Sequence, residues 1–196
     1  VIHAVEEINR KVKDKFKLHP VVSTMMPKKN PTLWDFINSW IFLKNNILNG
    51  EAGLQFSINS TSEVERYNMF SGNCSTLHEI HHIMEEQQKP KGRKYTLNFA
   101  VADYEINPEK LMQYFDPDEY LVKLTPMHKT YTALDNKIET KGDYSSYYPY
   151  EEYEYNLKKA GYDVLVFIAS KEEDEGLITC GNAILSGSFP KNGKEL

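Results

Sequence analysis

The chain has 196 residues, enough for one domain with a buried core. Its net charge of −5 at pH 7, with 40% hydrophobic and 26% charged residues, is typical of a globular protein with a mildly acidic surface and argues against a general nucleic-acid binder. The longest apolar runs are much shorter than the roughly 20 residues of a membrane-spanning helix, and no secretory leader opens the chain. We therefore expect a cytoplasmic protein with no membrane partner.

In chain order, short apolar β-branched runs alternate with amphipathic segments of helix length. We expect helices in residues 1–16, 32–50, 76–86, 107–116 and 149–161, and strands in residues 18–27, 53–60, 94–103, 119–127 and 162–170. Such alternation predicts a parallel sheet with right-handed crossovers, either doubly wound or a barrel. We predict the α/β class, with about five strands curved as part of an incomplete barrel. No repeat or linker divides the chain, so a single domain over residues 1–196 is expected.

Polar and turn residues predict several helix ends. Thr32 can cap the second helix and Gly50 can end it, while Asn107 can cap a helix with Pro108 at its first position. The first helix already begins at Val1, which is not a methionine, so we expect the chain to start inside a larger protein. The apolar stripe of this helix is Ile2, Val5, Ile8, Val12 and Phe16.

In parallel α/β folds the chemistry gathers at the carboxyl ends of the strands. The polar residues expected at these ends are Ser23, Thr24, Ser57, Asn59, Asp103 and His128.

The segment His78-Glu79-Ile80-His81-His82 matches the H-E-x-x-H pattern of zinc proteases. On a helix, His78 and His82 would share one face, with Glu79 placed to activate a metal-bound water. A third ligand is not selected by spacing; the candidates downstream are Asp103, Glu105 and Glu109. Because the helix also has an ordinary apolar stripe, we favour solvent-exposed histidines and keep a zinc-dependent hydrolase as the alternative.

Five segments, taken in order, resemble the radical SAM adenine methyltransferases that modify large-subunit ribosomal RNA. Residues 21–27, "VVSTMMP", resemble the strand end V-S-T-x-G-x-x-P, and residues 54–66, "LQFSINSTSEVER", resemble L-A-I-S-L-H-A-P-x-x-x-x-R. Residues 95–103 are similar to V-T-F-E-Y-V-L-L-D and residues 120–128 to V-N-L-I-P-F-N. Residues 157–185 resemble the closing L-x-x-A-G-I-x-V-T-V-R and A-C-G-Q-L stretches. The resemblance implies the C-terminal half of a radical SAM barrel.

The same resemblance implies a site for S-adenosylmethionine. Ser23 and Ser57 stand where the family contacts this cofactor, Ile58 and Asn59 lie in the same cofactor-binding run, and His128 occupies the position of a cofactor-binding asparagine. Short polar groups can hydrogen-bond a methionyl or ribose group without filling the pocket. From the residues alone, we would favour serines that simply end strands or cap helices.

Cys180 aligns with the family's methyl-carrying cysteine, which accepts a methyl group from one cofactor molecule before a deoxyadenosyl radical from another acts on it. The family's iron–sulfur motif, C-x-x-x-C-x-x-C, would lie upstream of Val1. The fragment alone is therefore expected to be inactive, and a cofactor-binding scaffold without catalysis is a further alternative. Cys74 aligns with nothing functional and is expected to be a buried small residue.

The chain also departs from the family. Met26 replaces a glycine, Asn59 a histidine and His128 an asparagine, and the acidic segment of residues 167–176 would repel RNA phosphates. Basic stretches at residues 11–17, 27–31 and 89–94 and the tyrosines of residues 144–155 favour RNA contact, but glutamates interrupt the tyrosines. RNA is thus an expected partner of the full-length protein only. An open sheet edge also predicts either a homodimer or a helix that covers the edge.

Overall fold

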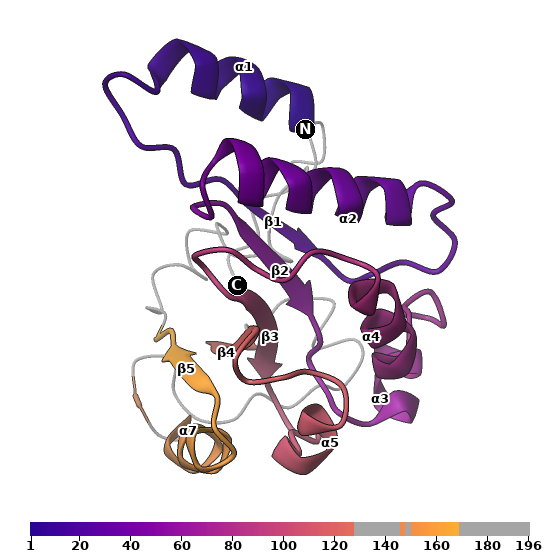
Figure 1. Cartoon of the computed structure of the whole chain (residues 1–196). Helices are drawn as coiled ribbons and strands as arrows, with labels where there is room; N and C mark the ends of the chain where they lie inside the picture. The colour runs from indigo at the N-terminus through magenta and orange to yellow at the C-terminus, as the bar shows by residue number, and fades with distance from the viewer. Residues whose placement is uncertain (128–145, 148–149, 169–196) are drawn as a thin grey trace, which may run out of the picture.

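The computed structural model describes residues 1–127, 146–147 and 150–168, and the elements are shown in Figure 1. The strands are β1 (Val21–Thr24), β2 (Gly53–Ser57), β3 (Tyr95–Val101), β4 (Tyr120–Pro126) and β5 (Asp163–Val166). The helices are α1 (Ile2–Val12), α2 (Leu33–Phe42), the π-helix η1 (Leu43–Ile47), α3 (Glu63–Met69), α4 (Leu77–Glu85), α5 (Pro108–Met112) and α7 (Tyr150–Lys159).

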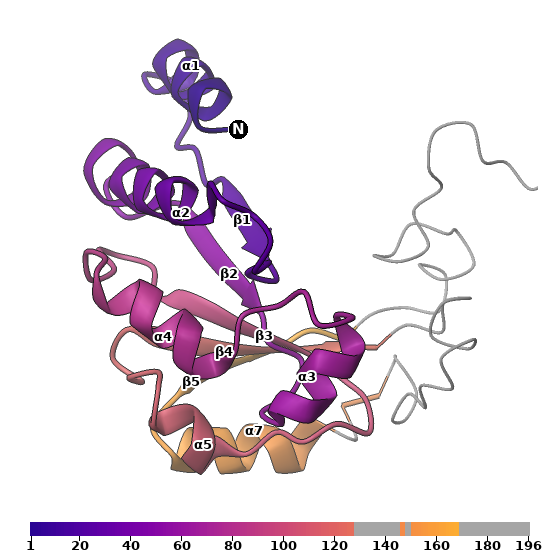
Figure 2. The same cartoon turned by 90° about the vertical axis from the view of Figure 1, so that its right-hand side faces the viewer.

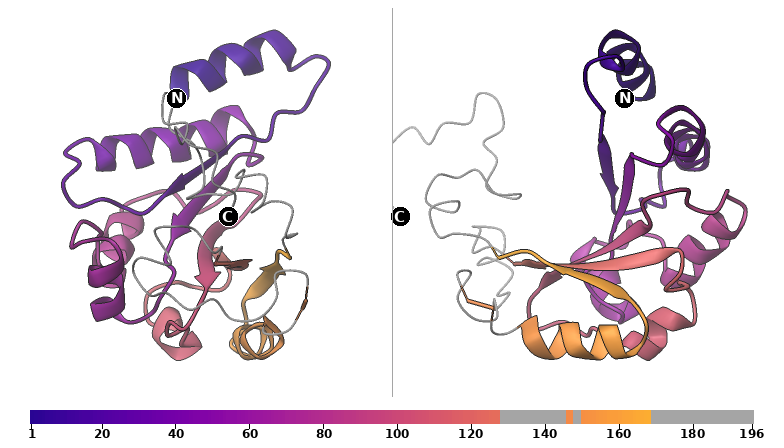
Figure 3. Two further views of the ribbon diagram at one scale, coloured as in Figure 1. Left: turned by 180° about the vertical axis from the view of Figure 1, so that it is seen from behind. Right: turned by 60° about the vertical axis from the view of Figure 1, so that its left-hand side comes forward.

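The five strands form one sheet in the order β1-β2-β3-β4-β5, and every neighbouring pair is parallel. Helices α4, α5 and α7 lie on one side of β3 to β5 (Figures 2 and 3), and α2 continues this layer beside β1 and β2. A strand order that never reverses, with helices on one side, is consistent with part of a β/α barrel. The expected α/β class with about five parallel strands is confirmed, and the sheet is open, with β1 and β5 at its edges.

The core lies between the sheet and this helical layer. Alternate residues of β3 and β4 are buried, as the two-residue period of a strand requires. On β3 they are Tyr95, Leu97, Phe99 and Val101. They pack in one cluster with buried residues of four helices: Ile37 and Trp40 of α2, Ile80 of α4, Leu111 of α5 and Leu157 of α7. Burial of each such side chain contributes roughly 1.5–3 kcal/mol.

Helix starts follow the predicted chemistry in part. Asn107 caps α5 through its side-chain oxygen, which accepts hydrogen bonds from the Glu109 and Lys110 backbone, as predicted. Thr32 occupies the N-cap position of α2, but its hydroxyl donates to the side chain of Asn30 instead of accepting from the helix. The predicted N-cap position of Thr32 is therefore confirmed, although its side chain makes no hydrogen bond to the helix.

The second predicted helix does not run unbroken to Gly50. It changes at Leu43 into the π-helix η1, whose Lys44 and Asn45 are buried. The Lys44 ammonium donates to the backbone oxygen of Lys91 at 2.5 Å. Asn45 accepts from the Lys91 backbone N–H and donates to the oxygen of Lys89. Together these two side chains hold the loop before β3 against the end of α2.

Gly50 packs against the same loop before β3, and this contact requires a glycine. Its φ is +87°, and a Cβ atom there would lie 2.4 Å from the backbone oxygen of Lys91. Only glycine satisfies both demands. The predicted turn at Gly50 thus exists, but it serves a backbone contact beyond the helix end.

Helix α1 is attached to the rest of the chain by one edge only. Ile2 and Val5 pack against the core, whereas Ile8 is 48% exposed. Phe16 lies beyond the helix end at Val12 and is 68% exposed, so the predicted stripe is wrong at its C-terminal end. In Figures 1 and 3 the helix stands alongside α2, away from the sheet. No helix in residues 1–127 or 150–168 has the length and apolar character needed to cross a membrane.

Candidate functional site

The sheet has a second face, which we call the polar face, formed by the strand residues that alternate with the core residues. The register aligns Ser23 with Gln55 and Gln55 with Thr96. One step further along, Ser57 aligns with Asn98 and Asn98 with Lys123. Polar side chains of four neighbouring strands therefore point to the same side of the sheet.

Ser23 and Ser57, the two serines of the predicted cofactor site, both lie on the polar face. Ser23 is exposed and is next to the last residue of β1, and its hydroxyl accepts a 2.7 Å hydrogen bond from the Gln55 side chain. Ser57 is the last residue of β2 and is half-buried. The two serines thus stand at the carboxyl ends of adjacent parallel strands, where ligands of such sheets bind.

Asn98 lies between Ser57 and Lys123 in the row, and its side chain is not satisfied within the protein. The Asn98 Oδ1 atom is shielded from solvent and has no hydrogen-bond partner. In the described chain, Lys123 makes no ion pair; its Nζ atom lies 5.8 Å from the ring centre of Phe167. Sequence reasoning missed both residues, because neither matches a motif and only the register brings them together.

Ile58 and Asn59, the other predicted cofactor residues of this loop, have different orientations. The Ile58 side chain is fully buried in the core, and its backbone N–H donates to the oxygen of Asn98. Asn59 has a φ of +61°, which side-chain-bearing residues rarely adopt. Its Oδ1 atom accepts a 3.0 Å hydrogen bond from the backbone of Ala100. Ile58 therefore supports the loop from the core, and Asn59 links the loop to β3.

Arg66 is the main positioning residue of this end of the sheet. It is fully buried, and its guanidinium donates to the backbone oxygen of Ile58 at 2.5 Å and of Ser75 at 2.8 Å. The Ser75 N–H in turn donates to the oxygen of Met26, just after β1. Burial lowers the pKa of Arg66, but a guanidinium stays charged. One side chain thus fixes the loops after β1 and β2 relative to each other.

Two other strand-end residues of the prediction have local roles. The Thr24 hydroxyl accepts from the backbone N–H of Met26, whose φ is +55°. Asp103 is exposed beyond the end of β3. Neither residue lies in the rows of the polar face.

The H-E-x-x-H segment forms the first turns of α4, with His78 and His82 exposed on its surface. Glu79 is the third residue of a capping box: its carboxylate accepts a 2.7 Å hydrogen bond from the Thr76 backbone. It also lies 2.9 Å from the Lys28 ammonium. Partial burial alone would raise the pKa of Glu79, but these bonds outweigh burial and lower it. The carboxylate therefore stabilises the helix start and is a poorer base.

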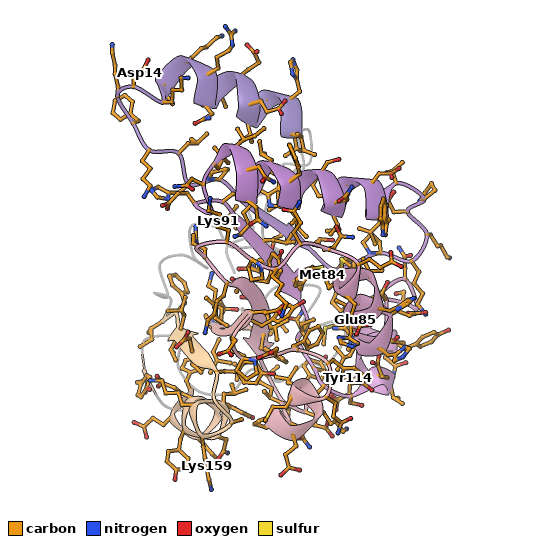
Figure 4. All side chains as sticks on the ribbon, viewed as in Figure 1. Asp14, Met84, Glu85, Lys91, Tyr114 and Lys159 are labelled. Carbon is orange, nitrogen blue, oxygen red and sulfur yellow. The ribbon has the colours of Figure 1, made fainter. Side chains whose placement is uncertain are left out.

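In the described part of the chain, no third zinc ligand accompanies the two histidines. Among residues 1–127, 146–147 and 150–168, no group of three His, Cys, Asp or Glu side chains is arranged to hold a metal ion. The ring of His78 packs instead on Tyr114, labelled in Figure 4, at a centre distance of 6.3 Å. Glu105, one of the suggested third ligands, accepts from Thr61 and pairs with Lys110 at 2.6 Å. This side of α4 is explained by packing and capping.

Several lysines of the basic stretches are paired with carboxylates. These pairs are Lys17 with Glu51, Lys28 with Glu79, Lys89 with Glu119 and Lys94 with Asp163. Pairing reduces the positive charge that these stretches can offer to phosphates. RNA contact stays a prediction.

Cys74 is buried, as predicted, and its thiol donates weakly to the backbone oxygen of Arg66. Burial raises the pKa of the Cys74 thiol, so it is not a reactive thiolate. His128 and Cys180, the remaining predicted site residues, lie outside the described residues.

Comparisons of the chain with protein-family models, with curated proteins and with solved structures found no match.

Proposed function

We propose that the chain provides the S-adenosylmethionine-binding half-barrel of a radical SAM, methyltransferase-like enzyme. One observation carries the proposal: Ser23 and Ser57, which the resemblance assigns to the cofactor, lie on one face at the carboxyl ends of adjacent parallel strands. They belong to different segments of the sequence, and the strand register brings them to the same face of the sheet. An open parallel sheet with helices on one side is also the form expected for part of a barrel.

The polar face fits the chemistry of this cofactor. S-adenosylmethionine carries an ammonium, a carboxylate, ribose hydroxyls and an adenine amine, all of which form hydrogen bonds. The two serine hydroxyls, the unpaired Oδ1 atom of Asn98 and the ammonium of Lys123 offer partners for them. When bound, the cofactor supplies the methyl group. The residues of this chain bind and orient it.

An iron–sulfur cluster does not fit the described residues. Such a cluster requires three thiolates that leave one iron free for the cofactor. Cys74, the cysteine within the described part, is buried with its thiol directed to a backbone oxygen. The cluster, the methyl-carrying role of Cys180 and an RNA substrate therefore remain predictions of the resemblance, and we derive no radical step from the described residues.

The zinc-hydrolase alternative receives no support from the side chains around α4. Its essential base, Glu79, is engaged by Thr76 and Lys28. A scaffold that binds the cofactor without catalysis shares the proposed binding site and differs from our proposal only in the steps that follow cofactor binding. It would be indicated if a full-length protein that contained the cluster bound S-adenosylmethionine without cleaving it.

The proposal is tested by titration calorimetry of the whole chain with S-adenosylmethionine. We expect saturable binding that weakens at least about tenfold in Ser57→Val, because the variant loses a hydrogen bond to the ligand. Ser39→Val, on the exposed side of α2, is the matched control and should bind as the wild type does. Absence of binding to the wild-type chain, or equal binding by Ser57→Val, would contradict the proposal.

A further inference from the structure

The dipeptide Asn49-Gly50 follows the π-helix η1 and precedes β2. An asparagine loses its side-chain amide most readily before a glycine, because glycine has no Cβ atom to obstruct attack by its own backbone nitrogen. We propose that Asn49 is a deamidation site that the folded chain protects, and that reaction there prevents the surrounding contacts from forming again. The site precedes β2, whereas Ser23 and Ser57 lie at the carboxyl ends of their strands, so the inference is independent of the proposed function.

The reaction needs only water as a co-reactant. The backbone nitrogen of Gly50 loses its proton and attacks the side-chain carbon Cγ of Asn49. A new C–N bond forms, and the bond from Cγ to Nδ2 breaks with release of ammonia. Water then opens the resulting cyclic imide at either of its carbonyl carbons. One product is aspartate and the other is isoaspartate, whose backbone contains an additional methylene group.

The two residues of the dipeptide have opposite environments. Asn49 is exposed and has a φ of +50°. Gly50 is buried, and its backbone N–H donates a 2.7 Å hydrogen bond to the backbone oxygen of Lys44. The Gly50 oxygen accepts from the Arg93 N–H at 3.1 Å. Because the attacking nitrogen must lose the proton that it shares with Lys44, the reaction has to wait until this hydrogen bond opens.

The loop before β3 holds Gly50 from the other side. A Cβ atom on Gly50 would lie 2.4 Å from the backbone oxygen of Lys91, which is labelled in Figure 4. The Asn45 side chain accepts from the Lys91 N–H at 3.0 Å and keeps this loop in place. We call residues 44–50 together with residues 89–93 the η1 corner. Deamidation of the folded chain therefore requires local opening of the η1 corner.

Isoaspartate does not fit this close packing. Its additional methylene group lengthens the backbone immediately before Gly50. A Cβ atom on Gly92 would lie 3.0 Å from the Gly50 oxygen and 3.1 Å from its Cα atom, so the glycine has little space to move. The lengthened chain therefore cannot restore the contacts of the η1 corner. The Lys44 side chain, which is fully buried in the unmodified chain, then becomes accessible to solvent.

The test follows deamidation of the whole chain by mass spectrometry of its proteolytic peptides during incubation at mildly alkaline pH. In the chain unfolded with guanidinium chloride, Asn49 should react at a rate similar to that of Asn192, which also precedes a glycine. In the folded chain we expect Asn49 to react at least about tenfold more slowly than in the unfolded chain. Equal rates in the folded and unfolded chains, or no reaction at Asn49 in the unfolded chain, would overturn the inference.

Two variants separate opening of the η1 corner from unfolding of the whole chain. Asn45→Leu leaves the Lys91 N–H without its acceptor, so Asn49 should react at least about threefold faster than in the wild type. Thr76→Ala removes the cap at the far end of α4 and should leave the rate within about twofold of the wild type. An unchanged rate in Asn45→Leu, or equal acceleration by both variants, would overturn the inference.

A second readout tests the consequence of the modification. The isoaspartate-containing chain, separated by ion-exchange chromatography, is compared with Asn49→Asp, which has the same added charge but an ordinary backbone. We expect the isoaspartate chain to have a lower melting temperature than Asn49→Asp, because only the former loses the contacts of the η1 corner. Equal melting temperatures would contradict the claim that the contacts do not form again.

Discussion

At the scale of single residues, Arg66 determines how the loops after β1 and β2 are arranged. We predict that Arg66→Met lowers the free energy of unfolding by about 3–5 kcal/mol, because the buried oxygens of Ile58 and Ser75 lose their donors. The measurement is denaturant unfolding followed by circular dichroism. Arg10→Met removes an exposed arginine paired with Glu7 and should stay within about 0.5 kcal/mol of the wild type. An Arg66→Met protein as stable as Arg10→Met would contradict this account.

Lys44 predicts an unusual dependence of stability on pH. Burial, assisted by the nearby charge of Arg93, lowers the pKa of Lys44 to about 8, from 10.5 for an ordinary lysine. The unfolded chain therefore binds this proton more tightly than the folded chain. Burying the charged Lys44 ammonium therefore lowers the free energy of unfolding. This destabilisation is fully present below pH 8 and disappears as the pH rises from about 8 towards 10.5. We expect stability to increase by about 1–3 kcal/mol across this window from this group.

The test has to separate the effect of Lys44 on the pH dependence of stability from the effect of three buried tyrosines. Burial raises the pKa values of Tyr95, Tyr120 and Tyr162, so stability falls at higher pH, where unfolded tyrosines ionise. The measured quantity is thus the difference in free energy of unfolding between wild type and Lys44→Met from pH 7 to 10. The wild type should gain stability relative to the variant. Lys91→Met, which removes an exposed lysine of the contacted loop, should parallel the wild type, and a flat difference for Lys44→Met would refute the prediction.

The residues of the candidate site could be predicted only where a motif marks them. Ser23 and Ser57 end recognisable strands, and a family resemblance points to them. Asn98 and Lys123 sit inside strands whose alternation reveals which face they occupy, but not which residue of the next strand is opposite. That depends on the register, which is set by the long-range packing of the whole sheet. Arg66 closes the segment of residues 54–66 that resembles the family, but its contacts with the backbone oxygens of Ile58 and Ser75 depend on the fold and could not be predicted from that match.

At the scale of elements, α4 shows how a motif can have a structural origin. Thr76→Ala removes the cap that accepts from the Glu79 backbone at 3.1 Å. We predict a loss of about 1 kcal/mol in the free energy of unfolding, as for other N-cap threonines. His82→Ala, on the exposed side of the same helix, should change stability by less than about 0.5 kcal/mol. Chemical denaturation of the two variants checks this. A larger loss of stability in His82→Ala than in Thr76→Ala would favour a structural or metal-binding role for the histidine.

The order and type of most elements followed from hydrophobic periodicity. Each of the five predicted strand segments contains a strand, because parallel strands buried on one face carry dense β-branched and aromatic runs. Helix α3 (Glu63–Met69) was not predicted, since seven residues with one buried arginine show no apolar stripe. Its start has a signal nonetheless: the Ser62 side chain accepts from the Glu65 backbone, in the S-x-x-E spacing of a helix cap. The π-helix η1 had no such signal, and its buried Lys44 contacts the backbone of Lys91, which is distant in the sequence.

At the scale of the whole molecule, the open sheet predicts self-association through an edge strand. In the described chain, β1 pairs with β2 alone, and Val21 on it is 55% exposed. We expect light scattering after gel filtration to give a mass that rises with concentration from 22.7 kDa towards twice that value. Val21→Lys should suppress the rise, whereas Val64→Lys, on an exposed position of α3, should not. A constant monomer mass at every concentration would contradict the predicted dimer.

The central claim is that the carboxyl ends of β1 and β2 and the adjacent polar face bind S-adenosylmethionine. The most direct measurement is a titration of the isotope-labelled chain with this cofactor, followed by amide chemical shifts in NMR spectra. The account predicts saturable shifts at Ser23, Ser57, Asn98 and Lys123, with little change on the outer surfaces of α2 and α7. Shifts confined to those outer surfaces, or no shifts at millimolar cofactor, a concentration at which even binding as weak as about −4 kcal/mol is detected, would contradict it.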